Sequence, residues 1–384
     1  MPRTSRPLYT RVREILESAR TRMARSVNTT QVVANWLVGR EIVEEEQQGN
    51  KRADYGERLM HALSARLQRE YGEGYGLSSL KSIRSFYLAY PELLSGEKGH
   101  ALRGLLSLSS KSHALRGLSS LVPSSPLSHP ARGRSWSPGQ LHANLSWTHY
   151  RTLLRAESPA ARAFYEIEAS QQCWSARELE RQIASLLFER LAKSRDKAGV
   201  RRLATKGQEI LSPADIFKDP VVMEFIGLPE SHRLVESDVE QALLNQLQSF
   251  LLELGKGFAF VARQQRLTLD GDHFYIGLVF YHVVLKCYVL LDLKVGKLTH
   301  TDLGQLQLYV NYFDREKRTP GDHPTLGLIL CTDKNDAVVK YTLGDEQQKK
   351  IFASRYKFHL PTEAALKAEV RRELKQFGQP PPPA

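Results

Sequence analysis

Cysteine is scarce in this sequence, and its few residues are widely separated. The three cysteines are Cys173, Cys287 and Cys331. An odd number at these separations excludes a framework of paired disulfides and a Cys-x-x-Cys zinc site. The twelve histidines also show no His-x-His or His-Glu-x-x-His spacing, so a zinc site of those types is not indicated. The cysteine pattern instead fits a chain kept in a reducing cytosol.

Long apolar runs are also absent. The N-terminal stretch MPRTSRPLYTRVREI has no apolar segment, so it does not resemble a secretory signal. No stretch of the chain approaches the roughly 18 apolar residues that a membrane span needs. We therefore expect a cytoplasmic protein without a membrane partner.

Acidic residues are the third shortage. The sequence has 42 Asp and Glu against 54 Lys and Arg, which gives a net charge of +12 and a pI near 9.5. Its hydrophobic content of 41% and charged content of 25% are otherwise ordinary for a globular protein. The positive surplus favours a polyanionic partner, most simply nucleic acid. A generally basic globular protein without such a partner is the alternative.

The length of 384 residues allows two or three domains. Residues 1–191 are predicted to form a helical N-terminal domain, because apolar residues recur at helical spacing. Helices are expected within residues 9–48 and 55–70, and another ends near Tyr90, before a proline. The sequence Ser175-Ala-Arg-Glu178 is a capping box that opens a further helix.

A glycine-rich turn precedes the helix that ends near Tyr90. Gly72, Gly74 and Gly76 superficially resemble a phosphate-binding loop, but no strand precedes them, so we interpret the segment as a turn. Short helices joined by this turn, the later one bearing Lys81, fit a helix-turn-helix. An ordinary helical bundle is an equally good alternative.

Residues 94–140 differ in composition from the helical sequence around them. The stretch is rich in Ser, Gly, Leu, Pro and Arg, and the sequence HALRGL occurs twice, from His100 and from His113. We interpret it as a disordered insertion. Between Lys98 and Ala156 there is no acidic residue but eight Lys or Arg. Such a segment suits either tracking of a phosphate backbone or a plain basic linker.

The C-terminal half is predicted to be a second domain. Residues 192–222 are charged and are interpreted as a linker, residues 223–376 as the domain, and residues 377–384 as a Pro-rich tail. Within the domain, Ser237-Asp-Val-Glu240 is a capping box that opens a helix of about 18 residues. Asp270-Gly271 predicts a hairpin turn.

Strands are expected in GFAFVARQ, FYIGLVFYH, LKCYVLLDLKV, TLGLILC and VVKYTL, with helices over residues 302–313 and 362–376. This order predicts a mixed sheet flanked by helices. The fold class is therefore a two-domain chain with an all-helical N-terminal domain and an α/β C-terminal domain.

One constellation in this domain can carry chemistry. Asp292 and Lys294 end an apolar strand, and side chains two apart in a strand point the same way. A metal-type ligand beside a cation suits phosphodiester chemistry. A buried ion pair is the structural alternative, although burying such a pair is a poor route to stability. Glu240 is equally explained as part of its capping box, and Gln305 as a polar helix residue.

A helix, strands carrying a carboxylate, Asp-x-Lys and a following helix with a glutamine together resemble the PD-(D/E)XK nuclease core. Over nearly the whole chain, the sequence resembles the YhcG-like nucleases. The resemblance is carried by NWLVGREIVEEEQQG, YGERLMHALSARL, SIRSFYLAYP, LSWTHYRTLLR, WSARELERQI, ESDVEQALL, FYIGLVFYH and LDLKVGK. It implies a helical DNA-binding domain and a restriction-endonuclease-like hydrolase domain that uses Mg²⁺ or Mn²⁺. DNA is the implied partner, and a homo-oligomer is left open.

The resemblance also implies roles for individual residues. Lys294 and Gln305 match catalytic positions, at which the lysine would stabilise charge on the phosphoryl group. Asp292 matches an acidic metal ligand, at a position where glutamate is more common in the family. Glu240, or alternatively Glu236, matches the acidic ligand on the preceding helix.

The sequence departs from the family pattern at Gly277. In FYIGLVFYH this glycine stands where the pattern has an aspartate, which would be the central metal ligand. Asp272 is no simple replacement, because five residues along a regular strand put it on the opposite face. We therefore expect an impaired or inactive metal-dependent DNA nuclease. The alternative is a non-catalytic DNA-binding or protein-interaction module on a nuclease scaffold.

Overall fold

The chain forms two compact units that share short segments. The computed structural model describes residues 28–47, 53–94, 136–156, 158–193, 197–228 and 235–360. The first unit, called here the helical unit, takes residues 1–183 and 200–207. The second, called the sheet unit, takes residues 184–199 and 208–384. No helix in the described ranges is long and apolar enough to cross a membrane.

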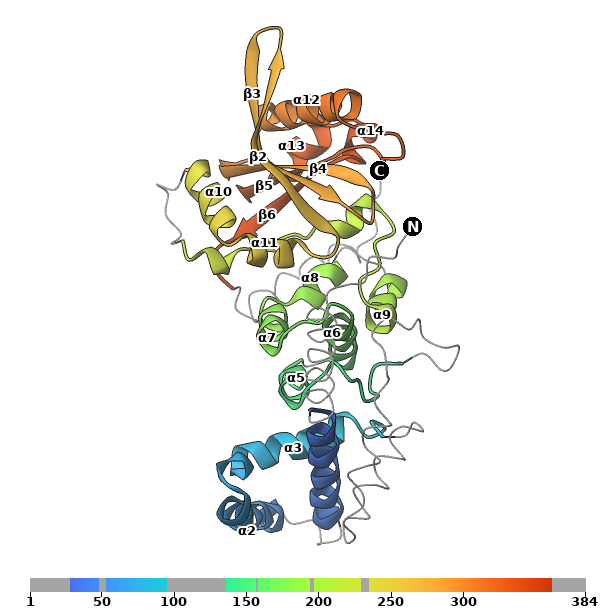
Figure 1. Cartoon of the computed structure of the whole chain (residues 1–384), viewed down its shortest axis with the longest axis vertical. Coiled ribbons are helices and arrows are strands. Elements are labelled where there is room, and N and C mark those ends of the chain that lie inside the picture. The colour runs from blue at the N-terminus through green and yellow to red at the C-terminus, as the bar shows by residue number, and fades with distance from the viewer. Residues whose placement is uncertain are drawn as a thin grey trace, which may run out of the picture. The chain divides into compact units, whose positions relative to one another are not determined.

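The helical unit is built from helices throughout its described residues, as predicted (Figure 1). Residues 28–47 are helical. The other helices are α2 (Ala53–Tyr71), the 3₁₀ turn η1 (Glu73–Tyr75), α3 (Leu77–Ala89), α5 (Trp147–Leu153), α6 (Pro159–Gln171), α7 (Ala176–Ala184) and α9 (Lys197–Lys206).

Helix α3 shows how an amphipathic sequence fixes this unit. Leu80, Ile83 and Phe86 are buried, and their spacing of three residues puts them on one helix face. The Phe86 ring packs 5.1 Å from the Tyr150 ring, centroid to centroid. At the end of α3 the Trp36 Nε1 donates a 2.7 Å hydrogen bond to the Tyr90 carbonyl, which satisfies one of the acceptors that a helix end leaves open.

Helices α2 and α3 are joined by the predicted glycine turn. Gly72 has a φ of +90°, a conformation that glycine adopts readily, and it opens η1 between the two helices. This order of helix, turn and helix fits both alternatives, a helix-turn-helix and an ordinary helical bundle. Arg84 on α3 forms an ion pair with Glu46, with a separation of 2.7 Å, so this cation of the second helix is already partnered.

The sheet unit contains a six-stranded mixed sheet, as predicted. Its strands are β1 (Val221–Val222), β2 (Phe258–Leu269), β3 (Asp272–His282), β4 (Cys287–Lys297), β5 (Leu326–Asp333) and β6 (Ile351–Lys357). The spatial order is β1-β6-β5-β4-β3-β2. Strands β2, β3 and β4 pair antiparallel, whereas β4, β5, β6 and β1 pair in parallel.

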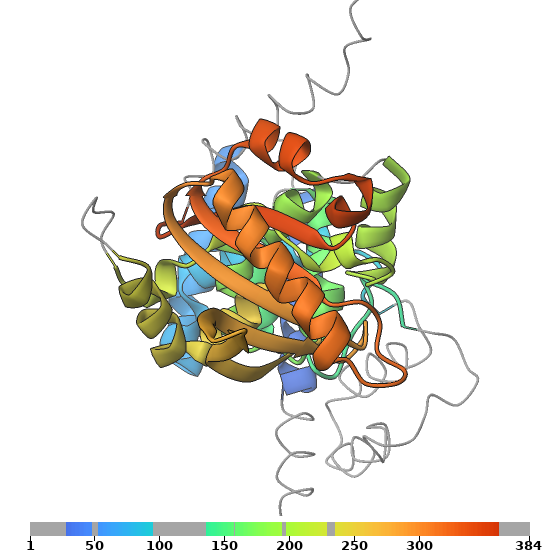
Figure 2. The same cartoon turned by 90° about the horizontal axis from the view of Figure 1, so that it is seen from above.

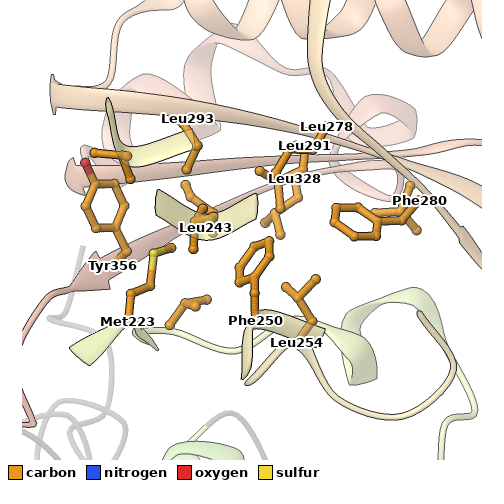
Figure 3. Close-up of a cluster of buried hydrophobic side chains, with 14 of the residues drawn as sticks. Met223, Leu243, Phe250, Leu254, Leu278, Phe280, Leu291, Leu293, Leu328 and Tyr356 are labelled. Atoms are coloured by element: carbon orange, nitrogen blue, oxygen red, sulfur yellow. The ribbon is translucent and has the colours of Figure 1, made fainter. Parts of the chain in front are cut away.

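Helices cover both faces of this sheet. Helices α10 (Glu236–Asn245) and α11 (Leu247–Leu254) pack on one face, where Phe250 and Leu291 belong to a large apolar cluster (Figure 3). Helix α12 (His300–Glu316) lies across the other face (Figure 2). Strand β4 is therefore buried from both sides, which explains its nearly continuous apolar sequence.

The β2–β3 hairpin has the predicted turn. Leu269 pairs with Asp272, and the two residues between them, Asp270 and Gly271, have φ angles of +47° and +93°. Two central residues with positive φ define the type I′ turn that suits a twisted hairpin. The turn therefore sets the register of β2 against β3.

Helix α8 (Leu187–Lys193) belongs to the sheet unit and is joined to helix α11 by a buried ion pair. Arg190 Nη1 lies 2.6 Å from Glu253 Oε1, and both side chains are fully buried. The same nitrogen donates to the Pro220 carbonyl, and the Val222 amide donates to the Glu253 carboxylate.

Several sequence predictions about the elements are wrong. The predicted linker, residues 192–222, contains α9, the 3₁₀ turn η4 (Pro213–Ile216) and the sheet strand β1. The segment VVKYTL is not a strand but lies mostly in helix α13 (Asp336–Thr342), because Asn335 caps its first amides. The long helix after position 236 is broken at Gln246 into α10 and α11. A short helix, α14 (Asp345–Gln348), and strand β6 were not foreseen.

Other predictions lie outside the described residues. These are the closing helix over residues 362–376, the Pro-rich tail and most of the insertion over residues 94–140. The last residues of that insertion are described, and they form a turn in which the Gly139 amide donates to the Glu166 carboxylate.

Candidate functional site

Strand β4 places Asp292 and Lys294 side by side near the middle of the sheet. It lies between β3 and β5, and residues two apart in a strand share a face. Lys294 Nζ is 3.4 Å from Asp292 Oδ2, and the two side chains are only 18% and 14% exposed. The expected pair of an acid and a lysine is therefore present.

Two further carboxylates surround the Lys294 ammonium group. Glu236 Oε2 and Asp302 Oδ1 each lie 3.7 Å from Lys294 Nζ. Asp302 is fixed at the start of α12 by Thr299, whose amide and hydroxyl both donate to it. Burial lowers the pKa of Lys294, but the surrounding carboxylates outweigh burial and raise that pKa above its usual value. Lys294 is thus a permanent positive charge at neutral pH.

Gly277 lies between the two remaining acidic residues of the cluster. A Cβ added to Gly277 would lie 3.2 Å from Glu240 Oε2 and 3.8 Å from Asp292 Oδ1. The nearest backbone atom would be the Leu291 carbonyl oxygen, at 3.3 Å. Gly277 does not have a positive φ, so its backbone does not require glycine. A side chain at this position would point at both carboxylates.

Glu240 is held in place from strand β2. Gln264 Nε2 donates a 2.6 Å hydrogen bond to Glu240 Oε2, and Arg263 Nε lies 3.8 Å from Glu240 Oε1. Burial raises the pKa of Glu240, while Gln264 and Arg263 oppose that rise. Helix α10 begins at Glu236 with Val235 as its N-cap and no side-chain cap bond. The alternative that Glu240 completes a capping box is therefore wrong.

Asp292 carries a buried oxygen atom with unused acceptor capacity. Its Oδ2 accepts no hydrogen bond of good geometry, and its nearest cation is Lys294 Nζ at 3.4 Å. Burial raises the pKa of Asp292, and the nearby Lys294 charge lowers it in part. A buried polar atom left in this state carries a desolvation cost. The atom is accordingly suited to accept a cation or a hydrogen-bond donor.

Gln305 reaches the cluster through a tyrosine. Its Nε2 donates to the Tyr309 hydroxyl 2.5 Å away, and Tyr309 is fully buried. Burial raises the pKa of Tyr309, and the charges of Asp292 and Lys294 also act on it. The Gln305–Tyr309 pair on α12 therefore lies within electrostatic range of Asp292 and Lys294.

The acidic side chains of the cluster supply only part of the ligand set that a divalent metal ion needs. Carboxylate oxygens are the ligands that Mg²⁺ prefers, and one or two can suffice when water and phosphate complete the octahedron. Asp292 and Glu240 are the two that face a common point beside Gly277. In the described part of the chain, however, no three His, Cys, Asp or Glu side chains are grouped so that they could hold a metal ion. A carboxylate at position 277 would lie beside both Asp292 and Glu240.

The structure thus brings Asp292, Lys294, Glu236 and Glu240 into one cluster with Gly277, and connects Gln305 to it indirectly. Sequence reasoning missed Asp302, Tyr309 and Gln264. The position of Asp302 could have been predicted, because Thr299-His-Thr-Asp302 is a capping-box pattern. Tyr309 follows Gln305 by four residues, a spacing at which helical side chains meet. Gln264 gave no signal, since its approach depends on an irregular register in β2.

Two family models match most of the chain. The DUF1016 N-terminal domain matches residues 11–113 and 134–190, and the YhcG PDDEXK nuclease domain matches residues 214–375. Together with the mixed sheet and its Asp-x-Lys strand, the second match defines a nuclease domain of the PD-(D/E)XK class, preceded by a helical domain. Over its whole length the chain is similar to "Putative nuclease YhcG" of Escherichia coli (strain K12). The two are 35% identical over 359 residues, which cover 93% of this chain and 91% of the relative. The chain therefore belongs to the YhcG family of nucleases.

The unmatched gap in the N-terminal domain, residues 114–133, falls inside the predicted insertion and is shorter than it. The family pattern thus continues further into the low-complexity stretch than composition suggested.

Solved structures resemble only part of the chain. The crystal structure of a repair endonuclease from Pyrococcus abyssi is 18% identical with a TM-score of 0.24, and the similarity covers 34% of this chain and 50% of that one. A structure of an EndoMS–dsDNA complex is 16% identical with a TM-score of 0.25, covering 35% and 49%. The chain thus spans about half the length of these two proteins.

Proposed function

We propose that this chain is a DNA-binding nuclease of the YhcG family whose metal-dependent phosphodiester hydrolysis is impaired or lost. The observation that carries the proposal is the position of Gly277. Its missing side chain would point at Glu240 and Asp292, where the family pattern has an aspartate. The cluster thus lacks the ligand that would join its two acidic sides.

Two observations support DNA as the substrate class: the positive charge of the chain and its membership of a nuclease family. The chain carries a net charge of +12, which favours a polyanion, and it belongs to a nuclease family. The helix-turn-helix order of α2, η1 and α3 makes the helical unit a second candidate for contact with DNA. Its sequence-derived DNA-binding role stays a proposal.

The chain's own residues would contribute charge and position. Lys294 keeps its positive charge beside Asp292, where it would stabilise negative charge that develops on a phosphoryl group. Gln305 and Tyr309 would hold the helix side of the site in place. Mg²⁺ or Mn²⁺ held by Asp292 and Glu240 would supply Lewis-acid polarisation of the phosphoryl oxygen.

A second candidate function is a non-catalytic DNA-binding or protein-interaction module. The observation that favours it is that the cluster is largely satisfied by its own groups. Lys294 lies within ion-pair distance of three carboxylates, and Glu240 is engaged by Gln264 and Arg263. Polar side chains satisfied in this way do not require a metal ion to hold the fold.

A cleavage assay on plasmid and branched DNA with Mn²⁺ distinguishes the two functions. We expect the wild-type protein to show little or no cleavage, and whatever cleavage it shows to disappear in Lys294→Ala. Robust cleavage that Lys294→Ala abolishes would refute the proposal that catalysis is impaired. Another residue would then have to bind the metal ion in place of the aspartate. Cleavage that Lys294→Ala leaves unchanged would come from a contaminant. DNA binding that falls steeply with salt but ignores EDTA would favour the binding module.

A further inference from the structure

The β2–β3 hairpin extends beyond the rest of the sheet as a two-stranded ribbon, defined here as residues 264–277. Strand β3 pairs with β4 only from Leu278 to His282, whereas β2 and β3 stay paired out to Leu269 and Asp272. The projecting hairpin is plain in Figure 1. At about 3.3 Å per residue, the six ribbon residues of β3 span roughly 20 Å.

The two faces of the ribbon differ in chemistry. Leu267 and Ile276 are buried in the apolar cluster that includes α12, so this face packs inward at the base. Cross-strand partners share a face. On the other face Arg266 lies opposite Tyr275, and Thr268 lies opposite His273. These four residues are exposed, and Tyr275 keeps 49% of its surface in contact with solvent.

The exposed ribbon face leads directly to the candidate site. Tyr275 and Gly277 are two residues apart on β3, so they lie on the same face. On β2, Gln264 at the base of the ribbon donates to Glu240 in the acidic cluster. A linear ligand bound along this face would therefore pass from the ribbon to the carboxylates and Lys294.

The polar groups on this face are organised but not neutralised. Arg266 Nη2 lies 3.0 Å from His273 Nε2, and Thr268 Oγ1 lies 3.2 Å from His273 Nδ1. Within the described ranges, Arg266 takes part in no ion pair. Asp272 lies on the opposite face, because it pairs with Leu269. The face therefore offers a fixed guanidinium, hydroxyl and imidazole groups and an exposed aromatic ring.

We infer that the ribbon enters the major groove of double-stranded DNA and leads the duplex to the candidate site. The inference rests on the proposed function. The major groove, about 12 Å wide, admits a two-stranded β-ribbon. Arginine is the side chain best suited to bind phosphate oxygens and guanine edges. The guanidinium group of Arg266 is available for such contacts, because no carboxylate forms an ion pair with it in the described ranges.

The test measures binding of a fluorescein-labelled duplex, and of its single strand, to the full-length chain by fluorescence anisotropy over a salt series. The ribbon variant is Arg266→Gln with Tyr275→Ala. The matched control is Arg318→Gln with Tyr341→Ala, which removes the same side-chain types at exposed positions outside the ribbon. We expect the ribbon variant to lose duplex affinity by about fivefold or more and to reduce the salt slope by about 1. The control should bind as the wild type does.

The possible outcomes separate the ribbon from the proposed function. Duplex binding that the ribbon variant retains in full overturns the ribbon assignment but leaves the proposed function standing. Loss confined to the single strand overturns the duplex assignment. A wild-type chain that binds neither DNA overturns both proposals.

A photocrosslinking measurement covers the case of a misfolded variant. If the melting temperature of the ribbon variant falls, a crosslinking experiment replaces the binding measurement on that variant. Benzoylphenylalanine is introduced at position 275, and at position 341 as the control. Crosslinks to duplex DNA from position 275 alone support the ribbon. Equal crosslinking from both positions, or none from position 275, overturns it.

Discussion

Gly277→Asp is the substitution that tests the site most directly. The backbone accepts it, because Gly277 does not have a positive φ. The new Cβ would lie 3.2 Å from Glu240 Oε2 and 3.3 Å from the Leu291 carbonyl oxygen, so the neighbours must move by only a few tenths of an ångström. The variant is therefore expected to fold and to place a third carboxylate beside those of Glu240 and Asp292.

The stability of this variant should depend on divalent metal. Like charges about 4 Å apart repel by about 4 kcal/mol at an effective dielectric constant of 20, which is an upper bound here because a buried aspartate can take up a proton. Without metal, Gly277→Asp should thus be less stable than the wild type. An ion at 100 times its dissociation constant restores about 2.7 kcal/mol. Mn²⁺ should therefore raise the melting temperature of the variant more than that of the wild type.

Cleavage should rise in the same variant. A well-placed metal ion supplies several kcal/mol of transition-state stabilisation, and each 1.36 kcal/mol is a factor of ten in rate. We therefore expect Mn²⁺-dependent cleavage by Gly277→Asp to exceed that of the wild type on the order of 10²-fold. Adding Lys294→Ala to the variant should remove the gain.

Gly277→Asn is the matched control, because it has nearly the same shape without the charge. It should gain neither metal-dependent stability nor cleavage. If Gly277→Asp behaves like Gly277→Asn in both measurements, the inferred place of Gly277 in the site is wrong. A metal-dependent rise in stability without cleavage would locate the defect elsewhere in the site.

Two further predictions concern buried charges away from this site. Burial raises the pKa of Glu166 to about 8 from its usual 4.5, against the opposing Gly139 amide and Arg162. Since the folded state holds the proton more tightly, its stabilising contribution is full below pH 4.5 and is lost as the pH rises to about 8, by up to about 5 kcal/mol. Urea unfolding at pH 5 and pH 8.5 should show this loss in the wild type but not in Glu166→Gln, and equal pH slopes would refute it. Arg190→Met leaves the buried Glu253 carboxylate without its cation, which should cost about 3–5 kcal/mol. In urea unfolding, the double variant Arg190→Met with Glu253→Gln should recover part of that loss. A midpoint for Arg190→Met equal to that of the wild type would refute the argument.

The antiparallel part of the sheet was predictable because its signals are local. Asp270-Gly271 specifies its own turn type, and the turn then fixes which residues of β2 and β3 face each other. Asp292 and Lys294 were predictable for the same reason, since the two-residue period of a strand puts them on one face. No long-range information is needed for either.

The parallel part of the sheet and the finer geometry of the site depend on long-range packing. Val338 and Val339 have high strand propensity, yet they lie in α13, which Asn335 caps, while the position beside β5 in the sheet is taken by β6. The approach of Glu240 to Gly277 requires α10 to pack against the sheet at one particular offset. The family resemblance assigned both positions to one site, but spacing alone gave no reason to place them within a few ångströms.

The glycine at position 277 is best explained by the charge it removes. An extended strand gains nothing from glycine, which costs about 0.5–1 kcal/mol relative to alanine in such a position, and no positive φ demands it here. Around it, four carboxylates are opposed by Lys294 and Arg263. A further aspartate would deepen this negative excess and repel a DNA phosphate until a divalent ion bound. With glycine the excess is smaller, which would lower the repulsion of a phosphate. Under the proposed function, the glycine that would weaken catalysis would thus also favour metal-independent binding, which unites the two candidate functions in one physical cause.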